Sequence, residues 1–198
     1  MRVSLTRLAL VLGFWSGIAF AGAEEKPVEV IIDTEVGTIE VEIDTVRAPR
    51  TAANFLAYVD AEHYDGGQFH RTVTMDNQPN DDVRIEVIQA SVHSERVDEG
   101  FPPISLERTT ETGLSHKDGT ISMARREPDS ATSSFFFCIG DQPSLDFGGA
   151  RNPDGQGFAA FGRVVSGMDV VRKIQASPAE GQRLTPPVQI VKIRRKTP

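Results

Sequence analysis

Alternating apolar and charged residues at positions 28–44 restrict the fold of this chain more than any other feature. Every second residue is Val or Ile on both sides of a Glu35-Val36-Gly37 turn, and acidic residues separate them in the second half. A period of two places successive side chains on opposite faces of a strand. The segment is therefore predicted to be a hairpin of half-buried strands, and its acidic residues form a solvated face rather than a metal site.

The remaining pattern predicts two helices and several more short strands. Ala52, Phe55, Leu56 and Val59 form the stripe of an amphipathic helix that begins near Pro49. A second helix is expected after Ser166, which would cap it together with Asp169. Short apolar runs, typical of strands, lie between loops at residues 68–73, 84–89, 120–123, 134–139, 164–165 and 188–193. The fold class is therefore mostly β, a closed antiparallel barrel capped by two α-helices.

The first residues have the pattern of a secretory signal peptide. Arg2 and Arg7 precede an apolar run at residues 8–20, and small residues end it as Ala21-Gly22-Ala23. The run is shorter than the roughly 20 residues that span a bilayer, although an uncleaved anchor helix is the alternative. We expect residues 1–23 to be removed, which leaves one domain at residues 24–198 that is exported, most simply to the periplasm, with no stable membrane insertion.

Composition indicates a globular domain that does not bind nucleic acid. Apolar residues make up 39% of the chain, charged residues 25%, and the formal net charge is -7. Binding to phosphates needs clustered Lys and Arg, and the one basic cluster is Arg194-Arg195-Lys196 at the C-terminus. We interpret that cluster as a frayed, solvated tail.

No familiar arrangement for covalent or metal chemistry is visible in the sequence. The single cysteine, Cys138, follows three phenylalanines and is expected to be buried in a strand. The four histidines are scattered without the spacing of metal ligands, and no nucleophile stands beside a base. A hydrolase is therefore unsupported, and no metal or cofactor is expected. An enzyme built on this chain would act through shape and electrostatics.

Several segments together resemble the cyclophilin family over residues 28–196. Their order and spacing carry the resemblance, since each short motif alone is weak. They are Phe69-His70-Arg71, Val87-Ile88-Gln89, Gly119-Thr120-Ile121-Ser122-Met123-Ala124-Arg125, Ser133-Ser134-Phe135-Phe136-Phe137 and Phe158-Ala159-Ala160-Phe161-Gly162. The resemblance implies an eight-stranded antiparallel barrel with two capping helices, and peptidyl-prolyl cis/trans isomerase activity without a cofactor.

The resemblance also implies roles for individual residues. Arg71 would be the catalytic residue, donating toward the prolyl nitrogen, and Gln89 would hold it and the substrate backbone. Phe136 would form the floor of the proline pocket and Leu145 an apolar wall. The expected substrate-binding residues are Phe69, His70, Val87, Gln89, Ala124, Phe136, Leu145 and Phe158.

The chain departs from the familiar eukaryotic pattern at the pocket edge. Residues 72–85 and 147–157 form longer loops, and Glu86, Ser134 and Ser144 replace residues of the family pattern. These departures indicate a bacterial exported member with a reshaped pocket and weak binding of cyclosporin. Its partners would be proline-containing polypeptides, and we expect a monomer that assists the folding of exported proteins. The alternative is a proline-peptide binding module or chaperone with little turnover.

Overall fold

The computed structural model describes residues 27–197. The expected signal peptide at residues 1–23 lies outside the described residues. The strands are β1 (Val28–Thr34), β2 (Gly37–Ile43), β3 (Gln68–Val73), β4 (Val87–Ser91), β5 (Thr120–Met123), β6 (Phe135–Cys138), β7 (Ala159–Ser166), β8 (Ala179–Glu180) and β9 (Arg183–Arg195). The helices are α1 (Pro49–Asp60), α2 (Thr109–Thr112) and α3 (Met168–Gln175), with 3-10 turns at Ser94–Glu99 and Pro143–Leu145.

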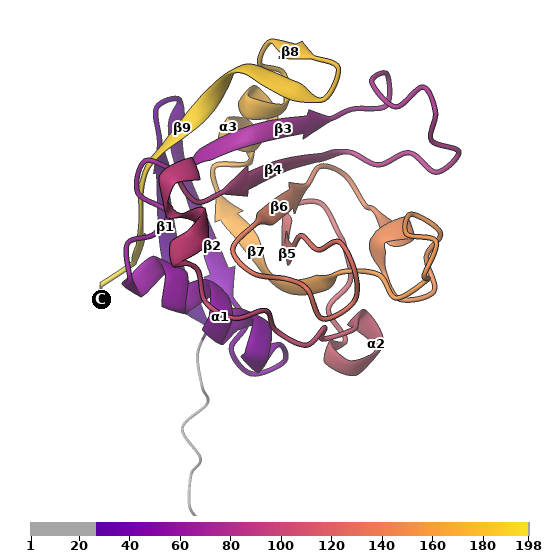
Figure 1. The fold of residues 1–198 in the computed structure, drawn as a ribbon, viewed down its shortest axis with the longest axis horizontal. Coiled ribbons are helices and arrows are strands. Elements are labelled where there is room, and N and C mark those ends of the chain that lie inside the picture. Colours follow the sequence, from indigo (N-terminus) through magenta and orange to yellow (C-terminus); the bar gives the residue numbers. More distant parts are fainter. Residues whose placement is uncertain (1–26, 198) are drawn as a thin grey trace, which may run out of the picture.

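Eight of these strands form a closed antiparallel barrel. Their order is β1-β2-β7-β5-β6-β4-β3-β9, and β9 pairs with β1 to close the ring. The short β8 pairs with β9 and lies outside the ring as the tip of a hairpin (Figure 1). The predicted closed eight-stranded barrel is therefore confirmed.

The first hairpin has the alternation that the sequence predicts. In β1 and β2, Val30 pairs with Val41 and Ile32 with Ile39, and all four side chains are fully buried. Gly37 opens β2 with a φ of 145°, and a Cβ there would lie 2.7 Å from a methyl of Val170 in α3. The turn therefore allows α3 to pack directly against the end of the barrel.

Two helices cover opposite ends of the barrel (Figure 1). Phe55 of α1 is fully buried, and its ring meets Phe135 edge-on at 5.4 Å and Phe161 at 5.2 Å. At the other end α3 contacts β2, β3 and β4. The four-residue α2 is an addition to the two helices expected. Among residues 27–197, no helix is long and apolar enough to cross a membrane.

The expected cap of the second helix was wrong. Ser166 is the last residue of β7, where it pairs with Glu40, and no side chain caps the start of α3. Gly167 makes the turn instead, with a φ of 90°, and a Cβ there would lie 2.4 Å from the carbonyl oxygen of Thr38. Contact with the first hairpin, rather than a local capping hydrogen bond, fixes where this helix begins.

The basic C-terminal cluster is not a frayed tail. Arg194 donates from two nitrogens to Asp65, and Arg195 donates from two nitrogens to Asp60. Lys196 lies 2.9 Å from Glu29 and 2.8 Å from Glu40 on the first hairpin. The cluster therefore continues β9 and helps to hold the strand where the barrel closes.

Cys138 is buried in β6, as the sequence predicts. Burial raises the pKa of its thiol far above the usual range, and the nearby acids Asp146, Asp118 and Asp141 raise it further. The thiolate is the reactive form of cysteine, so burial and the raised pKa both disfavour reaction of this thiol.

Candidate active site

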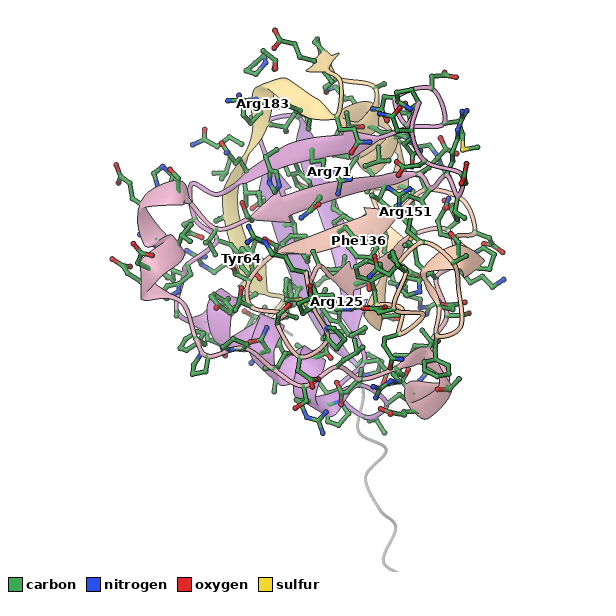
Figure 2. The ribbon with its side chains drawn as sticks, turned by 45° about the vertical axis from the view of Figure 1, so that its right-hand side comes forward. Tyr64, Arg71, Arg125, Phe136, Arg151 and Arg183 are labelled. Atoms are coloured by element: carbon green, nitrogen blue, oxygen red, sulfur yellow. The ribbon has the colours of Figure 1, made fainter. Side chains whose placement is uncertain are left out.

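One pocket on the outer wall of the barrel collects most of the expected site residues. Its volume is about 220 Å³. Seven of the expected residues line it: Arg71, Val87, Gln89, Ala124, Phe136, Leu145 and Phe158. They come from β3, β4 and β6 and from the loops that follow β5 and β6. Arg71 and Phe136 are labelled in Figure 2.

A larger hollow of about 540 Å³ contains none of these residues. Its charged side chains already have partners. Within the hollow, Arg47 lies 2.6 Å from Asp44 and Arg163 lies 2.7 Å from Glu42. Lys117 and Asp118 pair with Asp141 and Arg172, which lie outside its lining. The smaller pocket is the better candidate because an apolar floor and an ordered cation meet there.

The floor of the pocket comes from the alternation of β6. Phe135 and Phe137 point into the barrel and are fully buried, whereas Phe136 points outward. The ring of Phe136 meets Phe158 edge-on at 5.4 Å and packs with Leu145 and Val87 in a second, smaller apolar cluster. Three consecutive phenylalanines thus supply both the core and the floor of an apolar pocket.

Arg71 is fixed above this floor by two glutamines. Its Nη1 donates to Oε1 of Gln89, its register partner on β4, at 3.0 Å. Its Nε and Nη2 donate to Oε1 of Gln182 at 2.9 Å and 2.6 Å. A guanidinium held at all three nitrogens has one orientation, which is the condition for aiming a charged donor at a substrate.

Gln182 is a site residue that the sequence analysis missed. It follows Gly181, whose φ is 61°, in the turn between β8 and β9. Its carbonyl oxygen accepts from the amide of Thr72 at 2.9 Å, and its side-chain amide donates to the carbonyl of Asn77 at 3.2 Å. The signal that could have found it is the tight Glu180-Gly181-Gln182-Arg183 turn, which returns the chain beside β3.

The charge of Arg71 is partly desolvated. Burial lowers the pKa of its guanidinium, the charge of Arg151 lowers it further, and Asp81 opposes both. An arginine starts so far above neutrality that it remains a cation in the pocket. The pKa of neighbouring His70 is lowered, mainly by burial and also by the charge of Arg71, which favours the neutral ring.

Two expected site residues do not line the pocket. Phe69 is fully buried in the barrel and stacks on Phe137 at 6.3 Å, so its predicted contact with substrate is corrected. In a regular strand Phe69 and Arg71 would share a face, but a bulge between them turns Phe69 inward. His70 lies with Arg71 in an adjacent shallow hollow, where its Nδ1 is 3.4 Å from the hydroxyl of Ser91.

The second long loop, residues 147–157, is anchored to the pocket by Arg125. The Arg125 side chain donates to both carboxylate oxygens of Asp154, at 2.8 Å and 3.0 Å, and to the carbonyl of Gly157 at 2.8 Å. Its guanidinium also lies over the ring of Phe158, 5.2 Å from the centroid. This loop therefore has a defined position at the pocket wall.

The two long loops meet each other through Arg151. Its Nη1 donates to the carbonyl of Val83 at 2.6 Å and lies 3.2 Å from a carboxylate oxygen of Asp81. The loop of residues 72–85 is in turn closed by Gln78, whose buried amide bonds to the backbone of Thr74 and Ile85. Hydrogen bonds therefore tie both long loops to the pocket edge.

A buried Ser-His-Asp arrangement lies behind the floor, although the sequence suggested no nucleophile beside a base. His116 Nδ1 donates to Asp146 at 2.6 Å, and His116 Nε2 is 2.9 Å from the hydroxyl of Ser122. Ser122 is 0% exposed, so a substrate carbonyl cannot reach its oxygen. The His116 ring stacks on Phe136 with centroids 6.0 Å apart, which makes the arrangement a support for the floor.

No group of three or more His, Cys, Asp or Glu side chains within residues 27–197 is arranged to hold a metal ion. The pocket itself offers an oriented cation beside an apolar floor. Such a site can hold a small apolar group and stabilise charge that develops next to it.

Comparison with known proteins agrees with this arrangement. Residues 29–195 match the family model described as cyclophilin type peptidyl-prolyl cis-trans isomerase/CLD. A peptidyl-prolyl cis-trans isomerase of Acinetobacter baylyi is 35% identical, over 96% of this chain and 93% of the relative. Peptidyl-prolyl cis-trans isomerase A of Dickeya dadantii is 36% identical, over 87% of this chain and 85% of the relative.

Solved structures share the fold at lower sequence identity. A Cryptosporidium parvum cyclophilin-type isomerase has a TM-score of 0.69 at 19% identity, over 87% of this chain and 99% of that one. The barrel, the pocket and the family match lead to one assignment. The chain belongs to the cyclophilin-type peptidyl-prolyl cis-trans isomerase family, and its enzymatic class is peptidyl-prolyl cis-trans isomerase.

Replacing Gln182 by Leu removes the acceptor for two guanidinium N–H groups. We expect kcat to fall by about tenfold, or about 1.4 kcal/mol at the transition state, with KM little changed because the apolar floor is intact. The measurement is exchange spectroscopy of a neutral X-Pro peptide by NMR. Gln189→Leu, at an exposed position of β9, is the matched control. Equal activity of the two variants would contradict the role of Gln182.

The Asp146 carboxylate links stability to pH. Burial raises its pKa, but hydrogen bonds from the ring and the backbone of His116 outweigh this and lower the pKa below the usual value. A lowered folded-state pKa stabilises the protein above the unfolded-state pKa of about 3.9, and this stabilisation is lost as pH falls through the folded-state value.

We therefore expect the free energy of unfolding to fall below about pH 4, and to fall less steeply in Asp146→Asn. Urea unfolding at pH 7, 5, 4 and 3 measures both slopes. The variant should keep a residual dependence of stability on pH, because arginine partners also lower the pKa values of Asp60, Asp65 and Asp154. Identical slopes for parent and variant would show that Asp146 is not linked to stability.

Proposed function

We propose that this isomerase is exported and assists the folding of exported proteins by rotating their X-Pro peptide bonds, with Arg71 as the catalytic residue. The observation that carries the proposal is the orientation of Arg71 beside the outward-facing ring of Phe136. The substrates are exposed X-Pro segments of unfolded chains and loops.

The reaction needs a positioned charge because of the electronic structure of the amide. Sharing of the nitrogen lone pair with the carbonyl gives a rotation barrier of about 18–20 kcal/mol. Bonds before proline therefore take tens to hundreds of seconds to isomerise. A rate increase of about 10³- to 10⁵-fold requires about 4–7 kcal/mol of transition-state stabilisation.

In the proposed mechanism, Arg71 donates toward the prolyl nitrogen as that nitrogen becomes pyramidal in the twisted state. The hydrogen bond withdraws the lone pair from amide resonance, so it strengthens as the transition state forms. Phe136, Leu145 and Phe158 hold the proline ring, which keeps one side of the bond fixed while the other turns. No covalent bond is made or broken.

The substrate backbone would be held at the edge of the pocket. The amide of Ala124 already donates to the carbonyl of Ser134 at 2.8 Å. No hydrogen bond found among residues 27–197 uses the carbonyl of Ala124. That oxygen is the group we expect to accept from a peptide N–H, with Gln89 contacting the peptide on the other side of Arg71.

Export is supported by the N-terminal sequence and by the cysteine content. Two arginines, a short apolar run and Ala21-Gly22-Ala23 form the pattern that signal peptidases recognise. The single thiol, Cys138, is buried, which suits an oxidising compartment because it cannot form a disulfide with another chain while folded. The periplasm is the compartment that we propose.

The catalytic role is tested by Arg71→Ala in a protease-free isomerisation assay with a neutral X-Pro peptide. We expect a loss of roughly 10²- to 10³-fold in kcat/KM, the scale seen when one transition-state donor is removed. Arg183→Ala is the matched control, since Arg183 is the exposed register partner of Arg71 on β9. Full activity of Arg71→Ala at equal foldedness would overturn the mechanism, and peptide binding by the parent without acceleration would identify a binding module.

Export is tested by expressing the full chain in a double-membrane bacterium and fractionating the cells by osmotic shock. We expect a periplasmic protein that begins near Glu24, read from its intact mass. Arg2→Glu combined with Arg7→Glu removes the basic start of the signal and should leave the full chain in the cytoplasm. A parent chain that keeps all of its residues and stays in the cytoplasm would contradict the proposed location.

A further inference from the structure

The charge of the pocket is opposite to that of the protein as a whole. The chain has a formal net charge of -7, yet Arg71, Arg125 and Arg151 line the pocket and none of the described lining residues is Asp or Glu. Figure 2 shows the three arginines around Phe136. Such a local reversal of charge favours an anionic ligand group.

The three arginines are not equivalent. Arg125 has a side chain that is 1% exposed and is fully engaged by Asp154 and Gly157, so its charge is neutralised within the protein. Arg71 is held by Gln89 and Gln182 and has its catalytic role in the proposed function. The arginine left to recognise a substrate side chain is Arg151.

Arg151 has donors that remain available. Its side chain is 13% exposed, and the hydrogen bond and ion pair found for it within residues 27–197 both use Nη1. A guanidinium carries five N–H donors, so Nε and Nη2 can still bind a ligand. A desolvated charged donor without a partner is costly, which favours a ligand that supplies one.

Asp81, the existing partner of Arg151, would compete only weakly with a substrate carboxylate. Asp81 is 41% exposed and approaches Nη1 at 3.2 Å, and ion pairs with a solvated partner contribute little. The pocket also brings two cations together, because Arg71 and Arg151 both line it. A carboxylate placed between them would be attracted by both.

We propose that Arg151 makes this pocket select X-Pro segments that carry an Asp or Glu side chain directly beside the proline. The inference rests on the proposed function, because the proline ring on Phe136 sets where its neighbours lie. Arg151 and Phe136 line the same pocket, and consecutive Cα atoms are about 3.8 Å apart, so the residues directly beside the proline lie nearest to Arg151. The carboxylate therefore belongs to an adjacent residue rather than to a distant one.

The probes are blocked pentapeptides of the form acetyl-Ala-X-Pro-Phe-Ala-amide, with Glu, Gln or Lys at X. A second set carries the same residues directly after the proline. NMR exchange spectroscopy gives kcat/KM, and chemical-shift titration of the same samples gives Kd. We expect Glu to exceed Gln by roughly threefold to tenfold in one of the two sets, and Lys to be poorest.

Two variants change the preference in opposite directions. Arg151→Gln should bring the ratio of Glu to Gln close to one because the cation is lost, and this ratio within one variant does not depend on a general loss of activity. Asp81→Asn removes the competing carboxylate and should increase the ratio. Arg163→Gln removes an exposed cation of the larger hollow and is the matched control, with the parent ratio expected.

The outcomes separate this inference from the proposed function. Equal rates and affinities for the Glu and Gln peptides in both sets would overturn the selection by charge and leave the isomerase in place. A Glu preference unchanged in Arg151→Gln would also overturn it, by assigning the preference to another residue. If no peptide were accelerated, the proposed function would fail, and the Kd values would still decide whether the pocket prefers carboxylates.

Discussion

The closed barrel is the constraint on which the rest of the molecule depends. Eight paired strands enclose an interior just wide enough for side chains to fill it, so a ligand has no place inside. The strand alternation that fills the interior also projects every second side chain outward. On β6 the same three-residue run therefore provides two core rings, Phe135 and Phe137, and the floor of a pocket, Phe136.

The side chains of the pocket come from segments that are distant in sequence. Arg71 lies on β3. It donates hydrogen bonds to Gln89 on the neighbouring β4 and to Gln182 in the hairpin of β8 and β9. Behind the floor, the buried ring of His116 supports Phe136 and is itself tied to Asp146. The proposed catalysis by Arg71 depends on these contacts, because a guanidinium without them would lose its orientation before the transition state forms.

The sequence predicted what depends on local periodicity and missed what depends on closure of the barrel. The hairpin of β1 and β2, helix α1 and the burial of Cys138 follow from residue spacing alone. Phe69 points inward because of a β-bulge, which no local sequence pattern predicted. Gln182 and the ion pairs of Arg194 and Arg195 exist because distant segments meet in three dimensions, so they were missed or interpreted as a solvated tail.

We expect Gln182 to affect kcat through the Arg71 guanidinium, to which its side-chain oxygen is bonded. A double-mutant cycle on kcat tests it, with Gln182→Leu made in the parent and in an Arg71→Lys background, where the charge remains but the fork is lost. We expect the Gln182 change to lower kcat in the parent and to have almost no further effect in the Arg71→Lys background. The same loss in both backgrounds would contradict it, because Gln182 would then act independently of Arg71.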